Sequence, residues 1–208
     1  FEQKKFDKAE NFFKKTIELN PKYSHTLINL GNLYHLQGKQ EEAVLKYESA
    51  IELKRPDSYY AFIGLGNIYV KKKQMQEALN EYKKALALKP GHPLAIYNIG
   101  KIFELLNKTS EAVTYYQKAV NIDPDFSLAL NNLGVIYIHK ARYNEAITLF
   151  KRAIEANKEY VEAIGNLGVA YHFMGEIDLA KVYYRKALDF DPDYQTAKKN
   201  LNMLIHKK

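Results

Sequence analysis

Small residues return at a fixed interval along this chain, and that period limits the possible folds more than any other feature. One column consists of glycines spaced by 35, 34, 34 and 34 residues, with an asparagine at the next step: Gly31, Gly66, Gly100, Gly134, Gly168 and Asn202. A column of alanines keeps the same period: Ala9, Ala43, Ala78, Ala112, Ala146 and Ala180. An aromatic residue follows each alanine by four positions: Phe13, Tyr47, Tyr82, Tyr116, Phe150 and Tyr184. Such a period indicates one supersecondary unit stacked on copies of itself, with no central core.

The stretch 127–155 shows what one unit contains. Apolar residues recur at helical spacing in both of its halves, which predicts two amphipathic helices. Gly134 and Ala146 are small residues on otherwise bulky apolar faces, so two antiparallel helices can approach closely there. Residues 141–144 lie between the two helices and suit a tight reversal of the chain. The sequence therefore predicts an all-α chain of about twelve helices without strands.

These columns resemble the tetratricopeptide repeat family, in which Leu or Ile, Gly, aromatic, Ala and Pro positions recur in the same order. Prolines close most of the units: Pro21, Pro56, Pro90, Pro124 and Pro192. The chain departs from the family pattern because it contains no Trp and has Lys158 where a proline would close the unit. The resemblance implies a right-handed superhelical solenoid of antiparallel helix pairs, with a concave groove lined by the first helix of each pair. It also implies binding of a protein or peptide rather than chemistry.

The columns divide residues 1–208 into a single array of repeats. Residues 1–23 are predicted to be a half repeat with a second helix only, and residues 195–208 a C-terminal capping helix. The five full repeats are predicted at 24–57, 58–92, 93–126, 127–160 and 161–194. Because the half repeat lacks its first helix, we expect Phe1 and Phe12 to be partly uncovered, which leaves self-association through this face open. The chain begins in the middle of a repeat, so we interpret it as a fragment that catalytic or targeting segments could precede or follow.

Composition argues against several classes of function. Apolar residues make up 47% of the chain and charged residues 26%, as is ordinary for a folded protein in water. No apolar run approaches the ~20 residues that span a bilayer, so membrane insertion is not expected and a soluble, by default cytoplasmic, location is assumed. The absence of cysteine excludes disulfides and thiolate metal sites. The net charge of +7 comes with acids three or four positions after several basic residues, which predicts a solvated outer face and argues against nucleic acid.

An asparagine column is the main candidate for a binding site. Two positions before each glycine of the first column, the sequence reads Asn29, Gly64, Asn98, Asn132, Asn166 and Asn200. A carboxamide donates and accepts at once, so a ladder of such groups can pair with the backbone of an extended peptide. Positions beside the ladder complete the predicted peptide-binding groove: Asn32, Asn67, Tyr97, Lys101 and Asn131. Asparagine is also common at this family position where no ligand is known, so a purely structural role stays open.

The sequence does not indicate catalysis, a cofactor or a metal. Nucleophile elbows, phosphate-binding loops and zinc-protease motifs are absent. Histidines recur near the ends of first helices, at His35, His139, His172 and His206, but equivalent positions of successive repeats lie too far apart to share one ion. Ile28 and Ile63 stand where a chaperone-type carboxylate clamp would need a cation, which argues against that mode of binding.

Three functions remain compatible with these patterns. The first is a non-catalytic interaction scaffold that holds an extended segment of a partner in the groove. The second is the recognition arm of a larger enzyme, because the asparagine column resembles that of the superhelix preceding the catalytic region in O-linked N-acetylglucosamine transferases. The third is RNA binding, since related helical repeats read single strands, although the basic residues here fall mostly on the outer helices. The sequence names neither the partner nor the oligomeric state.

Overall fold

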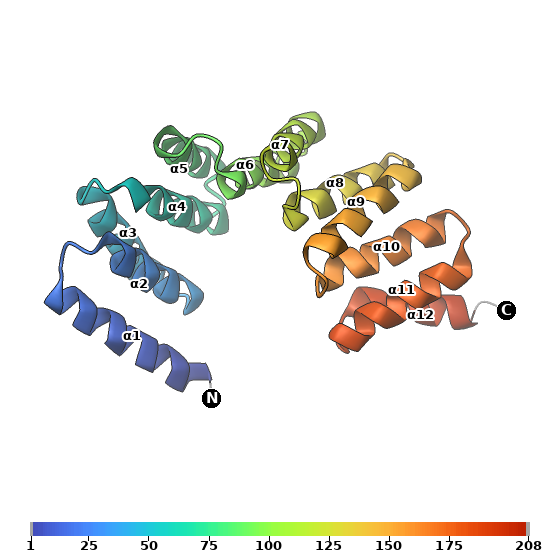
Figure 1. Ribbon diagram of the computed structural model, residues 1–208, viewed down its shortest axis with the longest axis horizontal. Coiled ribbons are helices and arrows are strands. Elements are labelled where there is room, and N and C mark those ends of the chain that lie inside the picture. Colours follow the sequence, from blue (N-terminus) through green and yellow to red (C-terminus); the bar gives the residue numbers. More distant parts are fainter. Residues whose placement is uncertain (1, 207–208) are drawn as a thin grey trace. The chain divides into compact units, whose positions relative to one another are not determined.

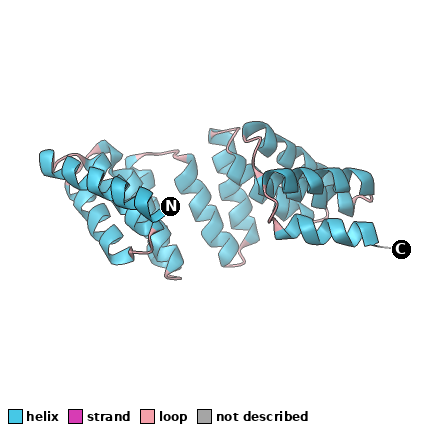
Figure 2. Ribbon diagram, turned by 90° about the horizontal axis from the view of Figure 1, so that it is seen from below, coloured by secondary structure: helices cyan, strands magenta, loops and turns pink. Residues whose placement is uncertain are grey.

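The computed structural model describes residues 2–206, which form twelve α-helices and one 3-10 turn, with no strand among them. The elements are α1 (Glu2–Leu19), α2 (Ser24–Leu36), α3 (Gln40–Glu52), η1 (Pro56–Ser58), α4 (Tyr59–Lys71), α5 (Met75–Leu88), α6 (Pro93–Leu105), α7 (Thr109–Ile122), α8 (Ser127–His139), α9 (Tyr143–Ala156), α10 (Val161–Phe173), α11 (Ile177–Phe190) and α12 (Gln195–His206) (Figure 1). Short loops join successive helices (Figure 2). The all-α prediction is confirmed. Phe1 and residues 207–208 lie outside the described part.

The chain divides into two compact units, residues 1–102 and 103–208, and each is described by itself. In the first unit α2 pairs with α3, and α4 with α5. In the second unit α8 pairs with α9, and α10 with α11, while α12 packs on α11. Each pair consists of two consecutive helices joined by a tight turn, as the period requires. The division of the whole chain into one array with the boundaries given above stays a prediction.

The turn inside each repeat uses one residue with a left-handed backbone. These residues are Gly38, Lys73, Asn107, Ala141 and Gly175, with φ of 78°, 61°, 58°, 56° and 81°. The next backbone N–H bonds to a carbonyl five residues back, as from Arg142 to Tyr137 at 2.8 Å. This bond satisfies a carbonyl group that the helix end would leave open, and it reverses the chain within a few residues. The conformation costs a non-glycine residue such as Ala141 about 1 kcal/mol.

The alanine columns and the aromatic column between them form the core of both units. The members of the two alanine columns that have no exposed surface are Ala43, Ala50, Ala78, Ala85, Ala112, Ala119, Ala146, Ala153, Ala180 and Ala187. The buried members of the aromatic column are Tyr47, Tyr82, Tyr116, Phe150 and Tyr184. A helix with a small–aromatic–small stripe can approach its neighbours closely, and the ring then fills the remaining space.

Each of four rings packs directly on the glycine of its partner helix. If the glycine carried a Cβ, its distance to the ring would be 2.7 Å for Gly31 and Tyr47, 2.4 Å for Gly66 and Tyr82, 2.5 Å for Gly134 and Phe150, and 2.8 Å for Gly168 and Tyr184. Carbon atoms in van der Waals contact lie about 3.5–4 Å apart, so no side chain fits at these positions. The glycine column thus exists because of the aromatic column. We call this contact the aromatic–glycine lock.

Helix α1 covers the first unit from one side. Phe6, Phe13 and Ile17 pack against the buried cluster of α2 and α3. Phe12 points away from that cluster and is 67% exposed, as expected from the sequence. Phe1, the other residue expected to be uncovered, lies outside the described residues. Self-association through this face stays a prediction.

Candidate functional site

In each unit the first helices carry side chains that point away from the second helices, and we call this surface the first-helix face. Helices α2 and α4 form it in the first unit, and α8 and α10 in the second. Two buried tyrosines reach it with their hydroxyl groups: Tyr47 donates to Asn32 Oδ1 at 2.6 Å, and Tyr82 donates to Asn67 Oδ1 at 2.7 Å. Asn98 Nδ2 donates to Asn67 Oδ1 as well, at 3.2 Å. The rings of the aromatic–glycine lock therefore also orient amides on the surface.

These bonds decide what Asn32 and Asn67 offer to a ligand. In each carboxamide the oxygen already accepts a hydrogen bond from a tyrosine, so the remaining NH2 group can only donate. Both side chains are exposed. Helices α2 and α4 contain no acidic residue, and α4 ends on the exposed amine of Lys71. The first-helix face of this unit is rich in donors and suits a ligand with acceptor oxygens.

His35, at the end of α2, does not add a positive charge to this face at pH 7. Burial lowers the pKa of its imidazole, and the neighbouring charge of Lys71 lowers it further. Its Nδ1 atom is buried and has no hydrogen-bond partner among the described residues. The neutral ring leaves Lys71 as the cation that acts on this end of the face.

A chain of hydrogen bonds crosses the first-helix face of the second unit. Asn166 Nδ2 donates to Asn131 Oδ1 at 3.0 Å, and Asn131 Nδ2 donates to Asn132 Oδ1 at 3.4 Å. Asn132 Nδ2 donates to the Tyr116 hydroxyl at 3.2 Å, and that hydroxyl donates to the carboxylate of Glu104. All donors point the same way, so the bonds polarise one another toward the carboxylate. These asparagines are hydrogen-bonded to one another without any ligand.

The asparagines that we predicted as groove residues differ in exposure although they share sequence columns. Asn98 and Asn131 are buried, with 9% and 6% of their surface exposed. Half-buried members of the set are Asn29, Asn132, Asn166 and Asn200. The exposed amides of Asn32 and Asn67 are therefore the ones that a ligand reaches most easily.

Two further positions of the predicted groove have a structural explanation. Tyr97 is buried, and the amine of Lys101 lies 5.8 Å from the centre of its ring, within the range of a cation–π contact. Gly64 interrupts the asparagine column because a Cβ at this position would lie 2.4 Å from the ring of Tyr47. Packing, rather than ligand choice, therefore sets the residue at position 64.

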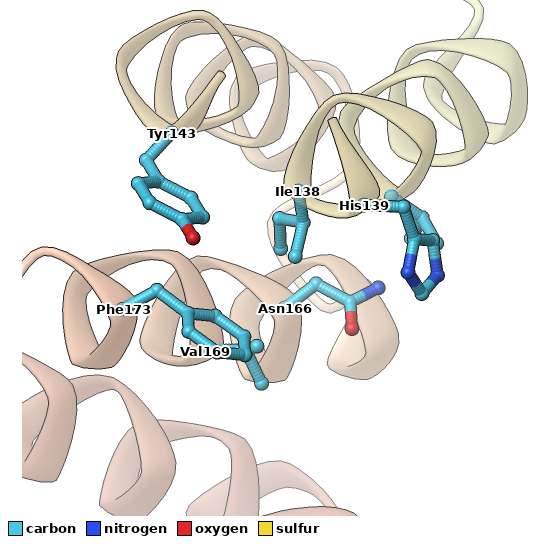
Figure 3. Close-up of a pocket in the computed structure, with 7 residues that line it drawn as sticks. Ile138, His139, Tyr143, Asn166, Val169 and Phe173 are labelled. Atoms are coloured by element: carbon cyan, nitrogen blue, oxygen red, sulfur yellow. The ribbon is translucent and has the colours of Figure 1, made fainter. Parts of the chain in front are cut away.

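An open pocket with a volume of about 430 Å³ lies on the first-helix face of the second unit. Its lining residues come from α8, α9 and α10: Val135, Ile138, His139, Tyr143, Asn166, Val169 and Phe173 (Figure 3). Tyr143 projects from α9 toward Phe173 on α10, and the two rings stack with centres 5.5 Å apart and planes at 4°. Asn166 and His139 lie at the other end of the pocket (Figure 3). The pocket thus has an aromatic wall and a polar edge.

A second pocket of about 420 Å³ adjoins the first at His139. Its lining consists of Glu104, Asn107, Thr109, Ile136, His139 and Lys140, and so includes charged groups that the first pocket lacks. His139 borders both pockets. One surface of the second unit therefore offers two adjoining pockets, of which only the second is lined by a carboxylate and an ammonium group.

Sequence reasoning did not find the apolar pocket or the role of the tyrosine hydroxyls. The position after each glycine reads Asn32, Asn67, Lys101, Val135, Val169 and Met203. The change from asparagine to valine within this column is the signal that could have found the pocket. A signal for the hydroxyls is Phe150, a phenylalanine in the aromatic column of the repeat in which position 135 holds valine instead of asparagine.

The buried hydroxyl of Tyr184 makes stability depend on pH. Burial raises the pKa of Tyr184 to about 12, and nearby Asn200 opposes this shift. Because the pKa is higher in the folded state, the neutral hydroxyl favours the fold, fully so below the unfolded pKa of about 10. This stabilisation is lost as pH rises through about 12. We expect Tyr184→Phe to change stability little at pH 7, because the hydroxyl lacks a well-aligned hydrogen bond. At about pH 11 the variant should be more stable than the parent chain by about 1 kcal/mol, because the parent alone loses stability by ionisation on unfolding.

Urea unfolding followed by circular dichroism at both pH values measures this difference. The exposed Tyr23 provides a control, and Tyr23→Phe should show no such gain at high pH. Equal gains in both variants would contradict the assignment.

Residues 2–206 contain no cluster of three or more His, Asp or Glu side chains that could hold a metal ion. Among the same residues, no helix combines the length and the apolar character needed to cross a membrane.

Paired helices of fixed period, joined by identical turns and locked by glycine and aromatic columns, define a helical-repeat scaffold. Family models described as "TPR repeat" match residues 31–72 and 66–107, and models described as "Tetratricopeptide repeat" match residues 12–44, 93–126 and 125–193. The chain belongs to the tetratricopeptide repeat family. None of the curated proteins compared with this sequence matches it.

Solved structures support the same fold. YrrB, described as a TPR protein with an unusual peptide-binding site, is 28% identical, with a TM-score of 0.60; the match covers 91% of this chain and 97% of YrrB. A chain of the APC/C hetero-tetramer Cut9-Hcn1 is 17% identical, with a TM-score of 0.81 over 98% of this chain and 40% of that one. The second similarity shows the fold alone. The family and the similarity to YrrB support a protein-interaction scaffold of the helical-repeat type.

Proposed function

We propose that this chain is a non-catalytic scaffold that binds an extended segment of a partner protein on its first-helix faces. The observation that carries the proposal is the orientation of Asn32 and Asn67 by Tyr47 and Tyr82. This orientation leaves the NH2 groups of both carboxamides as outward-facing donors at equivalent positions of successive repeats. An extended peptide presents carbonyl oxygens along its length, and each donor can take one of them without reading a side chain. The similarity to YrrB, a protein described as having a peptide-binding site, supports the same reading.

The other predicted groove residues have narrower roles in this proposal. Asn29, Asn132, Asn166 and Asn200 are half-buried and border the segment, while Asn98 and Asn131 hold their neighbours in place from below. Lys101, which rests on Tyr97, adds a positive charge that favours acidic side chains of the partner. Removing Asn132 or Asn166 would break the hydrogen-bond chain of the second unit. Alanine at these positions would therefore mix a loss of stability with a loss of binding.

A sharper variant changes the outward group and keeps the inward one. In Asn32→Asp/Asn67→Asp, the carboxylate oxygens still accept the tyrosine hydroxyls, but the outward NH2 donors become acceptors. We expect the affinity for extended peptides to fall at least about tenfold, because two donors are lost and carboxylates face carbonyl oxygens. The melting temperature should stay close to that of the parent chain, because the internal bonds persist.

The probes are peptides selected on the immobilised chain from a random-sequence display library and then synthesised. Calorimetry measures their affinity for the parent, for the double variant and for Asn80→Asp, an exposed charge change on the second helix α5. Binding lost in the double variant and kept in Asn80→Asp supports the proposal. Failure to select any peptide, or equal affinity for all three proteins, would overturn it.

A further inference from the structure

The second unit departs from the amide pattern of the first at the apolar pocket. In the first unit, the position after the glycine carries Asn32 and Asn67, and each takes a hydroxyl from the core. The corresponding positions in the pocket are Val135 and Val169, and the ring of the core column beside Val135 is Phe150, which has no hydroxyl to donate. At position 135 the loss of the acceptor accompanies the loss of the donor, whereas at position 169 the core ring, Tyr184, keeps a hydroxyl that has no hydrogen-bond partner among the described residues. The result is an apolar patch on a face that is otherwise polar.

The lining of the pocket restricts what can occupy it. It contains no carboxylate, ammonium or guanidinium group, and its polar groups lie at the edge, so a charged side chain on the apolar wall would lose hydration without gaining an ion pair with such a group. Phe173 is 59% exposed, and its ring is held in place by the stack with Tyr143. A bulky apolar side chain on this wall would remove apolar surface from water at about 25 cal/mol per Å². The chemistry of the pocket thus fits a leucine, methionine or phenylalanine side chain.

The polar edge of the pocket restricts the neighbouring backbone. Asn166 donates through Nδ2 to Asn131 at 3.0 Å, and this bond fixes the orientation of the carboxamide. Its Oδ1 atom has no donor among the described residues, so the pocket offers an acceptor beside the apolar wall. A backbone N–H next to the anchored side chain has the complementary polarity.

We propose that this pocket is a specificity site that takes one bulky apolar side chain of an extended partner segment, with the adjacent backbone N–H bonded to Asn166. The inference rests on the proposed function but adds a sequence requirement to it. The amides of the first unit hold backbone without regard to sequence, whereas this pocket selects one residue of a segment that binds on the second unit.

The selected peptides described above test this inference. We expect one position of the enriched sequences to be leucine, methionine or phenylalanine, and replacement of that residue by glycine to weaken binding at least about tenfold. The variant Phe173→Ser should weaken binding by a similar factor. The two changes should be non-additive in a double-mutant cycle, because they remove the same contact. A second variant, Val169→Asn, places the polar residue of the first unit into the pocket and should show the same loss.

The matched control is Phe190→Ser, which removes an aromatic residue of comparable exposure from the second helix α11 and should leave affinity unchanged. If peptides bind through Asn32 and Asn67 but ignore Phe173→Ser and Val169→Asn, the scaffold stands and the specificity site is overturned. Enriched sequences without an apolar position would have the same meaning. A dimer in sedimentation velocity that Phe173→Ser dissociates would also overturn it, because a second copy of the chain would then occupy the pocket.

Discussion

Phe150→Ala is expected to lower the free energy of unfolding by about 4 kcal/mol, the largest effect of a single substitution considered for this chain. The ring has no exposed surface and lies against Gly134, so its removal leaves a cavity that no neighbouring side chain lines from that side. The loss combines the transfer of an aromatic ring to water with the cavity that remains. Because each repeat is stabilised mainly by its neighbours, α8 to α11 should lose structure together.

Urea unfolding of the full chain, followed by circular dichroism, measures this loss, and amide hydrogen exchange locates it. The control is Phe190→Ala, in which the ring is 45% exposed and the change should stay within about 0.5 kcal/mol. Equal losses in the two variants would show that Phe150 is not part of a tightly packed core.

Gly66→Ala is expected to destabilise the first unit by about 2 kcal/mol, although alanine is the better helix former. In the middle of a helix, alanine alone would stabilise by about 1 kcal/mol. Here its Cβ would lie 2.4 Å from the ring of Tyr82, which is buried and bonded through its hydroxyl to Asn67. The ring cannot move away without breaking that bond, so the steric cost of the clash exceeds the stabilisation that alanine provides as a better helix former.

A double-mutant cycle with Tyr82→Leu separates the two terms. Leucine opens space beside position 66, so Gly66→Ala should cost at least about 1 kcal/mol less in that background. A stabilising effect of Gly66→Ala in the parent chain would refute the aromatic–glycine lock, because the helix propensity of alanine would then outweigh the steric contact with Tyr82.

The lock connects the core of the protein to its candidate binding surface. The ring of Tyr47 or Tyr82 fills the space over a glycine, and its hydroxyl then fixes an amide on the first-helix face. The same column turns apolar at Phe150, next to Val135 and the pocket. Val169 lines the same pocket although its core ring is Tyr184, so the core residue alone does not decide whether the surface beside it is polar or apolar.

The fold could be read from the sequence because its causes are local and repeated. The period places the helices, their small faces and the reversal predicted at residues 141–144. In the structure the reversal is made by Ala141, and α9 already begins at Tyr143. The asparagine columns could also be recognised in the sequence, but the exposure of their side chains could not be predicted from it. Asn29 and Asn98 share one column, yet the first is half-buried and the second buried, because the neighbours that cover them differ.

By itself, the sequence determined the all-α fold, the number of helices and the family, since residue type at a fixed period is sufficient to define a stacked unit. Only the tertiary structure decided which atoms of the amides face outward, because that depends on tyrosine hydroxyls arriving from another helix. It also decided that valines and aromatic rings from α8, α9 and α10 meet in one pocket. The physical reason is that hydrogen-bond direction and side-chain contact across helices follow from three-dimensional packing, which a one-dimensional period does not contain.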